Sequence, residues 1–187
     1  MTQETDSSDS IIRQLPPEIS NKIAAGEVIQ RPSSVVKELI DNSIDAGADH
    51  LKIVIQNAGR TLIQVIDNGS GMGEEDIRLC FEQHATSKIQ DMDDLFRVRT
   101  LGFRGEAMAS IASVSQVTLK TKRPDAEIGY KYEIWGGEEK SFEPAAVEDG
   151  TSVAVRNLFF NVRARRQFLK TDATEFRHIL KTVQQAA

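Results

Sequence analysis

The sequence predicts an α/β domain, and two kinds of hydrophobic periodicity together with the length of the chain support this fold class. Apolar residues recur at helical spacing over 33–47 and 172–184, whereas apolar and polar residues alternate over 51–56 as they do in a strand. With 187 residues, 40% of them hydrophobic, the chain is long enough to bury one sizeable core. The net charge of −5 argues against a generally basic surface of the kind that binds nucleic acid.

The two ends of the chain differ in character. We expect residues 1–10, which are rich in Thr, Ser, Asp and Glu, to form a disordered tail ahead of a folded domain over 11–187. The apolar residues 11–15 follow as an arm that can dock on the core or on a second copy of the chain. The last predicted helix reaches the end of the chain without a cap, which indicates a piece of a longer protein. No stretch resembles a membrane span or a signal peptide, so we expect a cytoplasmic protein.

Two helices are predicted before the first strand. Pro16 and Pro17 open a short helix that we expect to end at Gly26. The central helix runs from about Ser33 to Gly47, where a glycine suits the C-terminal stop. Its apolar residues share one flank that should face the core: Val35, Val36, Leu39, Ile40 and Ile44.

Strands and helices alternate through the rest of the chain. Strands at 50–56 and 62–67 form a hairpin around a turn at 57–60. Further strands are predicted at 116–121, 130–135, 140–143 and 151–157, and further helices at 74–82, 106–113, 163–170 and 172–184. The last helix should place these residues inward: Phe176, Ile179, Leu180 and Val183. Residues 83–105 show no sustained period, and so long an irregular stretch is usually functional, often a lid.

Cys80 is the single cysteine, so the chain cannot form an internal disulfide or a cysteine-based zinc site. Because it lies between Leu79 and Phe81, we interpret it as a small core residue. A reactive thiol is the alternative interpretation.

Three stretches carry residue types that suit a nucleotide site, and the first lies on the central helix. Glu38, Asn42 and Asp45 are four and three residues apart, so they form one stripe along that helix. A carboxylate one turn from an amide can hold a water and a hard cation. The solvated face of an ordinary amphipathic helix shows the same pattern.

The second stretch is Asp67-Asn68-Gly69-Ser70-Gly71. It follows a strand and precedes a helix, which excludes a simple hairpin turn. Glycines lack Cβ, so a ligand can approach the backbone closely here. A buried Asp67 at the strand end can accept a hydrogen bond from an exocyclic amine such as that of adenine. A plain strand-to-helix loop is the alternative.

The third stretch, 100–106, is a glycine-flanked loop that runs into a helix. Backbone N–H groups at a helix N-terminus can bind phosphate. The loop matches neither the Walker pattern nor the dinucleotide-binding glycine pattern. Residues 84–88 add hydroxyls and one ammonium that suit the same role. A flexible loop with a helix cap and a solvated polar loop are the alternatives.

Together the three stretches predict a nucleotide site. Magnesium keeps several waters and takes oxygen ligands, so one amide oxygen plus the substrate phosphates is a normal complement, and Asn42 fits that role. Glu38, one turn earlier, is then placed to orient and deprotonate the water that attacks the γ-phosphate.

Several motifs, in order, make the sequence resemble the N-terminal ATPase domain of the MutL family of DNA mismatch-repair proteins. This family belongs to the GHKL superfamily, shared by type II topoisomerases, the large heat-shock chaperone and histidine kinases. The resemblance runs from about Ile11 to the C-terminus. The motifs lie at 15–17, 22–29, 36–39, 42–47, 67–69, 84–88 and 101–107.

The resemblance implies the GHKL or Bergerat fold, a two-layer sandwich in which a mixed, largely antiparallel sheet carries helices on one face and ATP lies between the layers. It implies that Glu38 is the general base, that Asn42 is the magnesium ligand, and that Asp67 reads the adenine amine beside Thr151. The other implied nucleotide-binding residues are Asp45, Gly69, Gly71, Met72, Thr86, Ser87, Lys88, Leu101, Gly102, Phe103, Arg104 and Gly105.

The resemblance also implies an ATP-switched dimerising clamp that relays mismatch recognition by MutS to downstream repair enzymes. Family members place a phosphate-contacting lysine on a second domain that follows this one, so we expect turnover by the chain alone to be weak. We also expect DNA binding to be weak and to need that second domain. Protein phosphotransfer and a purely structural use of nucleotide are the alternative functions, and Glu38 argues against the first.

One departure from the family pattern is Arg163, which replaces the usual proline. The basic residues around it can line a DNA path or form a solvated helix face: Arg163, Arg165, Arg166 and Lys170.

Overall fold

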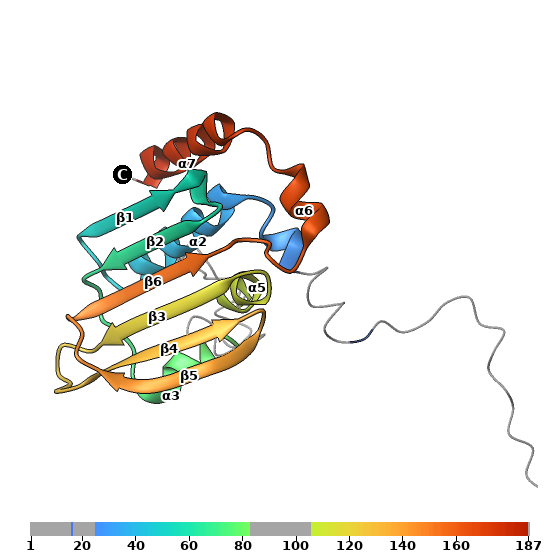
Figure 1. Cartoon of the computed structure of the whole chain (residues 1–187). Helices are drawn as coiled ribbons and strands as arrows, with labels where there is room; N and C mark the ends of the chain where they lie inside the picture. The colour runs from blue at the N-terminus through green and yellow to red at the C-terminus, as the bar shows by residue number, and fades with distance from the viewer. Residues whose placement is uncertain (1–15, 17–24, 83–105, 187) are drawn as a thin grey trace, which may run out of the picture.

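The computed structural model describes Pro16 and residues 25–82 and 106–186, which form a two-layer α/β domain (Figure 1). Six strands make one sheet in the order β1-β2-β6-β3-β4-β5, and α2 and α5 lie behind it in Figure 1. The predicted α/β sandwich is confirmed. All five pairings between the described strands are antiparallel, so this part of the sheet is antiparallel throughout rather than mixed.

The elements follow the predicted order closely. The strands are β1 (Leu51–Gln56), β2 (Leu62–Asp67), β3 (Gln116–Lys122), β4 (Gly129–Trp135), β5 (Glu138–Ala145) and β6 (Gly150–Arg156). The helices are α2 (Pro32–Asp45), α3 (Glu74–Leu79), α5 (Ala107–Ser113), α6 (Arg163–Phe168) and α7 (Asp172–Ala186), with a 3-10 turn η1 (Asn57–Gly59) between β1 and β2. β5 is longer and α3 shorter than predicted. None of the helices in the described ranges is long and apolar enough to cross a membrane.

One face of the sheet carries the core, because alternate residues of a strand point to the same side. The register places Val65, Val153 and Leu119 side by side across β2, β6 and β3, and all three are buried. The opposite face carries polar pairs such as Gln64 and Ser152, whose side chains share a hydrogen bond of 3.0 Å. The alternation predicted from the sequence therefore separates a core side from a polar side.

The central helix α2 packs one flank against β2 and α7. Four of its five predicted core residues are buried: Val35, Val36, Leu39 and Ile40. The prediction for Ile44 is wrong, since its side chain is 39% exposed. Ser43 takes the inward position instead, because its hydroxyl donates a hydrogen bond to the Asp67 carboxylate in β2. Gly47, with φ of +75°, ends the helical segment as predicted.

The helix before α2 does not end at Gly26, contrary to the prediction, since residues 25–28 are helical. Gly26 is needed there for space. Guanidinium atoms of Arg165, from α6, lie 1.9–2.2 Å from the point that a Cβ on Gly26 would occupy. Arg165 Nη1 donates to the Ile29 carbonyl at 3.2 Å, and the guanidinium lies 5.7 Å from the ring centroid of Phe159. Arg165 therefore joins α6 to the segment that leads into α2.

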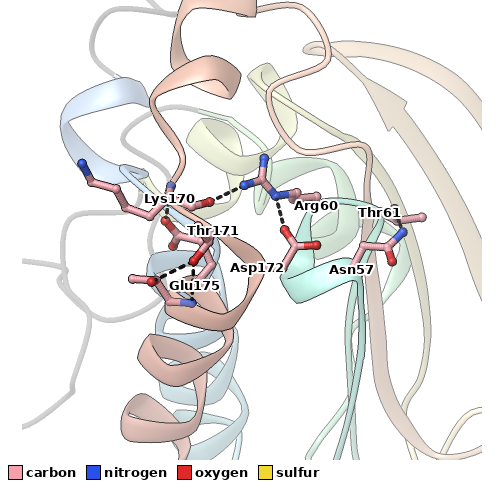
Figure 2. A network of polar contacts seen from close by, with 8 residues as sticks. Asn57, Arg60, Thr61, Lys170, Thr171, Asp172 and Glu175 are labelled. Carbon is pink, nitrogen blue, oxygen red and sulfur yellow. Dashed lines mark hydrogen bonds and ion pairs between the residues drawn. The ribbon is translucent and has the colours of Figure 1, made fainter.

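The hairpin turn between β1 and β2 holds the start of α7 (Figure 2). Arg60 Nε donates to Asp172 Oδ1 at 2.8 Å, and Arg60 Nη2 donates to the Lys170 carbonyl. Glu175, only 1% exposed, accepts the Lys170 N–H at 2.9 Å. These contacts tie the first turn of α7 to the edge of the sheet.

The same contacts set which face of α7 is buried. Ile179 is buried as predicted and Val183 packs partly against the core. Phe176 and Leu180 were predicted inward, but they are 44% and 46% exposed. The buried stripe runs through Glu175 and Ile179, one residue before each of the two, because Glu175 turns inward to reach the backbone of Lys170.

Helix α3 is attached to β4 and β5 through aromatic rings. Phe81, just after α3, stacks on Tyr132 at 5.2 Å between centroids, and Tyr132 meets Phe142 edge-on at 5.7 Å. Cys80 lies beside this cluster, and its thiol donates to the Ile77 carbonyl at 3.1 Å. Burial, with a smaller effect of nearby Asp76, raises the pKa of the Cys80 thiol from 9.0 to about 12.

Cys80 is therefore expected to be unreactive in the folded chain, as its interpretation as a core residue predicts. The thiol should react with a disulfide reagent at pH 8 far more slowly than the same thiol in the unfolded chain, because so little thiolate is present. The folded state holds this proton more tightly than the unfolded state, so the free energy of unfolding should fall as the pH rises from 9.0 towards about 12. Reaction rates with and without denaturant measure the effect. Rapid labelling of the native chain would contradict it.

The contact between Gly26 and Arg165 predicts that the effect of Gly26→Ala on the free energy of unfolding changes sign when the Arg165 side chain is removed. In the native background, Gly26→Ala should lower the free energy of unfolding, because the new Cβ displaces the Arg165 guanidinium and its hydrogen bond. In an Arg165→Ala background, the same change should raise it by about 1 kcal/mol, the helix-propensity gain of alanine over glycine. Urea unfolding of the four variants gives both values, and equal effects in the two backgrounds would contradict the contact.

Candidate functional site

A buried carboxylate at the end of β2 is the centre of the candidate site. Asp67 is 9% exposed. Its Oδ1 accepts the N–H of Gly69 at 2.9 Å and the N–H of Thr151 at 3.2 Å. Its Oδ2 accepts the Ser43 hydroxyl at 2.8 Å. The carboxylate is thus held from α2, from the loop after β2 and from β6, and an ionised carboxylate has acceptor capacity left for one more donor.

Two glycines beside Asp67 allow the backbone to pack closely. A Cβ on Gly71, where φ is +63°, would meet the Lys122 carbonyl oxygen at 2.1 Å. A Cβ on Gly150, where φ is +104°, would meet the Asp67 carbonyl oxygen at 2.1 Å. A Cβ on Gly69 would lie 2.9 Å from both the Cβ and the carbonyl oxygen of Ala46. At all three glycines the missing Cβ makes room for other parts of the chain. The predicted close approach of a base to Gly69 and Gly71 stays a prediction.

The ends of β3 and β6 complete the centre of the site. Thr121 is fully buried, and its hydroxyl lies 2.9 Å from Thr151 Oγ1 and donates to the Gly150 carbonyl at 2.9 Å. It also accepts the Met72 N–H at 3.0 Å. Four of the predicted residues, Asp67, Gly69, Met72 and Thr151, are therefore joined in one network, which we call the Asp67 network together with Ser43, Thr121 and Gly150.

The predicted catalytic stripe lies on the helix that supplies Ser43. Glu38, Asn42 and Asp45 are each partly buried, so the stripe is not the fully solvated face of an amphipathic helix. Asn42 precedes Ser43 directly, which brings the stripe next to the Asp67 network. A carboxylate and an amide one turn apart can serve the phosphate end of a nucleotide.

Several predicted nucleotide-binding residues lie outside the described residues. They are Thr86, Ser87, Lys88, Leu101, Gly102, Phe103, Arg104 and Gly105. Within the described ranges, no group of three or more His, Cys, Asp and Glu residues could hold a metal ion. The role of Asn42 as a magnesium ligand stays a prediction.

The sequence analysis missed two members of the Asp67 network, Ser43 and Thr121. Each has a recognisable signal. Ser43 is a polar residue on the apolar flank of an amphipathic helix, and Thr121 continues the inward positions of Val117 and Leu119 in β3. A polar residue at a core position needs a hydrogen-bond partner, and here the partner lies in the site.

The basic segment of α6 serves two different roles. Arg165 is engaged with Ile29 and Phe159, as described above, so it is a packing residue. Arg163 and Arg166 are exposed, as a solvated helix face requires. Arg163 is the first residue of α6, a position at which proline is also favoured, so the departure from the family pattern leaves the start of the helix intact.

The chain resembles known proteins over most of its length. Residues 30–146 match the family described as "Histidine kinase-, DNA gyrase B-, and HSP90-like ATPase". The chain is 59% identical over 175 residues to the DNA mismatch repair protein MutL of Chloroherpeton thalassium, covering 94% of this chain and 27% of that protein. It is 58% identical over 172 residues to MutL of Chlorobaculum tepidum, covering 92% of this chain and 28% of that protein. The chain therefore spans less than a third of the length of these relatives.

Solved structures agree with the sequence matches. The Aquifex aeolicus MutL ATPase domain complexed with ADP aligns with a TM-score of 0.67 and 33% sequence identity, covering 84% of this chain and 55% of that chain. A structure described as the N-terminal domain of a DNA repair protein aligns with a TM-score of 0.73 and 32% identity, covering 88% of this chain and 47% of that chain.

The hydrogen bonds of Asp67 predict how two substitutions affect stability. Asp67→Ala leaves the N–H groups of Gly69 and Thr151 without their acceptor and should cost about 2–3 kcal/mol. Asp67→Asn should cost about 1 kcal/mol or less, since the amide oxygen accepts both N–H groups and the Ser43 hydroxyl can turn to accept from the amide NH₂. Urea unfolding followed by Trp135 fluorescence separates the two. Equal losses would show that the negative charge, rather than the count of hydrogen bonds, holds the site.

Proposed function

This chain belongs to the family of histidine kinase-, DNA gyrase B- and HSP90-like ATPases, as the ATPase domain of a MutL-type mismatch-repair protein, and we propose that it binds ATP with magnesium and hydrolyses it to ADP and phosphate. The observation that carries the proposal is the Asp67 network, which joins an acceptor for an adenine amine to the helix with the predicted catalytic stripe. The ADP complex of the Aquifex aeolicus relative supports nucleotide as the ligand.

Asp67 and Thr151 would read the adenine base. The Asp67 carboxylate is fixed by three protein donors, so its remaining lone pairs point in a set direction. Adenine differs from other bases in its exocyclic amine, a donor that a fixed acceptor recognises. Gly69, Gly71 and Met72 lie in the loop that borders the same position, and Asp45 ends the helix beside it.

Glu38 and Asn42 would serve the phosphate end. Magnesium, when bound, neutralises charge on the phosphate oxygens. The Asn42 amide oxygen is a hard ligand of the kind that this ion takes, and no second protein ligand is required. Glu38 lies one turn before Asn42 and would accept a proton from the attacking water, as a general base does. The residues predicted to contact the phosphates, at 86–88 and 101–105, would complete this half of the site.

We place this activity in mismatch repair. By analogy with its relatives, the chain would act as part of an ATP-switched dimerising clamp that relays mismatch recognition by MutS to downstream repair enzymes in the cytoplasm. ATP drives such a switch only if it binds the dimer-competent state more tightly than the other state. The net charge of −5 is consistent with weak DNA binding by this part of the protein.

The role of Glu38 is tested by Glu38→Ala. The variant should bind a non-hydrolysable ATP analogue with magnesium about as tightly as the native protein, because the carboxylate acts on the water rather than on the nucleotide. Its phosphate release should fall at least about a hundredfold, the usual contribution of a general base. Calorimetric titration and a phosphate-release assay on the full-length protein give the two values.

The matched control is Glu75→Ala, which removes an exposed glutamate from α3 and should change neither value. Retained turnover in Glu38→Ala would remove the base assignment. Nucleotide that binds stoichiometrically but never turns over, even in the native full-length protein, would instead favour a structural cofactor.

A further inference from the structure

The buried hydroxyl of Thr121 has three hydrogen-bonding neighbours, and their chemistry fixes where each proton lies. Thr121 Oγ1 is 3.0 Å from the Met72 nitrogen, 2.9 Å from the Gly150 carbonyl oxygen and 2.9 Å from Thr151 Oγ1. The side chain is fully buried, so water cannot supply a missing partner. A hydroxyl offers one proton and two lone pairs, which equals the number of these contacts.

Only one arrangement gives each contact its own proton. The Met72 N–H can only donate, and the Gly150 carbonyl can only accept. The Thr121 proton therefore goes to Gly150, because two oxygens 2.9 Å apart without a proton between them would repel each other. The Thr121 hydroxyl then has one lone pair left for Thr151, so Thr151 is the donor in the pair of hydroxyls.

We propose that Thr121 is a positioning residue that keeps the Thr151 hydroxyl proton pointing into the protein, so that Thr151 offers only lone pairs to a ligand. Asp67, which already accepts the backbone N–H of Thr151 at 3.2 Å, is also an acceptor. Asp67 and Thr151 together present to a ligand an edge that carries hydrogen-bond acceptors and no donors. The inference rests on the proposed nucleotide site and specifies its chemistry.

An edge of this kind selects ligands by the donors that they carry. A 6-aminopurine nucleotide places an N–H donor there, either directly or through a bridging water. A purine without the 6-amino group keeps the adjacent ring nitrogen, an acceptor that adenine also carries, but lacks the donor, so the lone pairs on both residues stay unpaired. Thr121 thus favours the amino purine without touching it, because a ligand without the donor leaves buried polar groups unpaired.

The test compares ATP with purine riboside triphosphate, which lacks the 6-amino group. Both are titrated with magnesium into the native chain and into Thr121→Val, Thr121→Ser and Thr118→Val. Valine has the shape of threonine without the hydroxyl, and serine restores the hydroxyl. Thr118 lies on the same strand with its hydroxyl towards Glu133 on the polar face of the sheet, so its valine variant is the matched control.

The native chain should bind ATP at least about tenfold more tightly than the analogue. In Thr121→Val the Thr151 proton is free to turn outward, so affinity for ATP should fall about five- to tenfold while affinity for the analogue stays or rises. Discrimination between the two nucleotides should then nearly vanish. Thr121→Ser and Thr118→Val should discriminate as the native chain does.

Equal loss of affinity for both nucleotides in Thr121→Val would show a merely structural role and overturn the inference, as would unchanged binding. If Thr121→Val does not fold, Thr151→Val removes the acceptor itself, and preserved discrimination in that variant would overturn the inference. Failure of the native chain to bind ATP would overturn the proposed function as well, whereas ATP binding with unchanged discrimination in Thr121→Val overturns this inference alone.

Discussion

The site depends on one buried carboxylate. A carboxylate removed from water costs several kcal/mol unless donors replace its hydration. Asp67 obtains its donors from three parts of the chain, two of them distant in sequence, Ser43 in α2 and Thr151 in β6, and one local, Gly69 in the following loop. Satisfying this charge therefore fixes the height and rotation of α2 over the sheet. The same helix carries Glu38 and Asn42, so the demand for hydrogen bonds at one end of the site positions the residues proposed for the other end.

Close backbone contact gives the loop after β2 its shape. Gly71 lies against the Lys122 carbonyl of β3, and Gly150 lies against the Asp67 carbonyl of β2. Any side chain at these positions would separate the strand ends and lengthen the hydrogen bonds of Thr121 and Thr151. The glycines thus act within the protein fold, and the exposed surface of the loop remains available for the proposed base. Gly71 and Gly150 therefore serve the packing of the strand ends and, at the same time, the shape of the candidate site.

The sequence predicted the fold because it follows local rules, and the structure joins four of the residues predicted for the site in the Asp67 network, whose part in binding stays a prediction. Alternation and helical spacing located the strands and helices, and a strand-end aspartate followed by glycines located the centre of the site. The errors have a common physical cause. Ile44 and Phe176 are exposed because polar neighbours turn inward: Ser43 to reach Asp67 in β2, and Glu175 to reach the backbone of Lys170 five positions earlier. Gly26 stands inside a helix instead of ending it, and glycine is needed there because Arg165, 139 positions further along the chain, occupies the space of a Cβ. Hydrogen bonds and close contacts of individual polar side chains leave no trace in hydrophobic periodicity.

The two ends of the proposed site are built differently, and this difference bears on how ATP could act as a switch. The hydrogen bonds that orient Asp67 and Thr151 come from the protein's own groups, in α2, the paired sheet and the loop after β2. A base that enters such a pre-organised site gains affinity at little ordering cost. The same rigidity means that the base binds two conformational states of the protein about equally, and equal binding shifts no equilibrium. In the proposed clamp, the adenine end would therefore supply affinity and selectivity, and the differential binding that drives dimerisation would come from the phosphate end, where Glu38 and Asn42 are proposed to act.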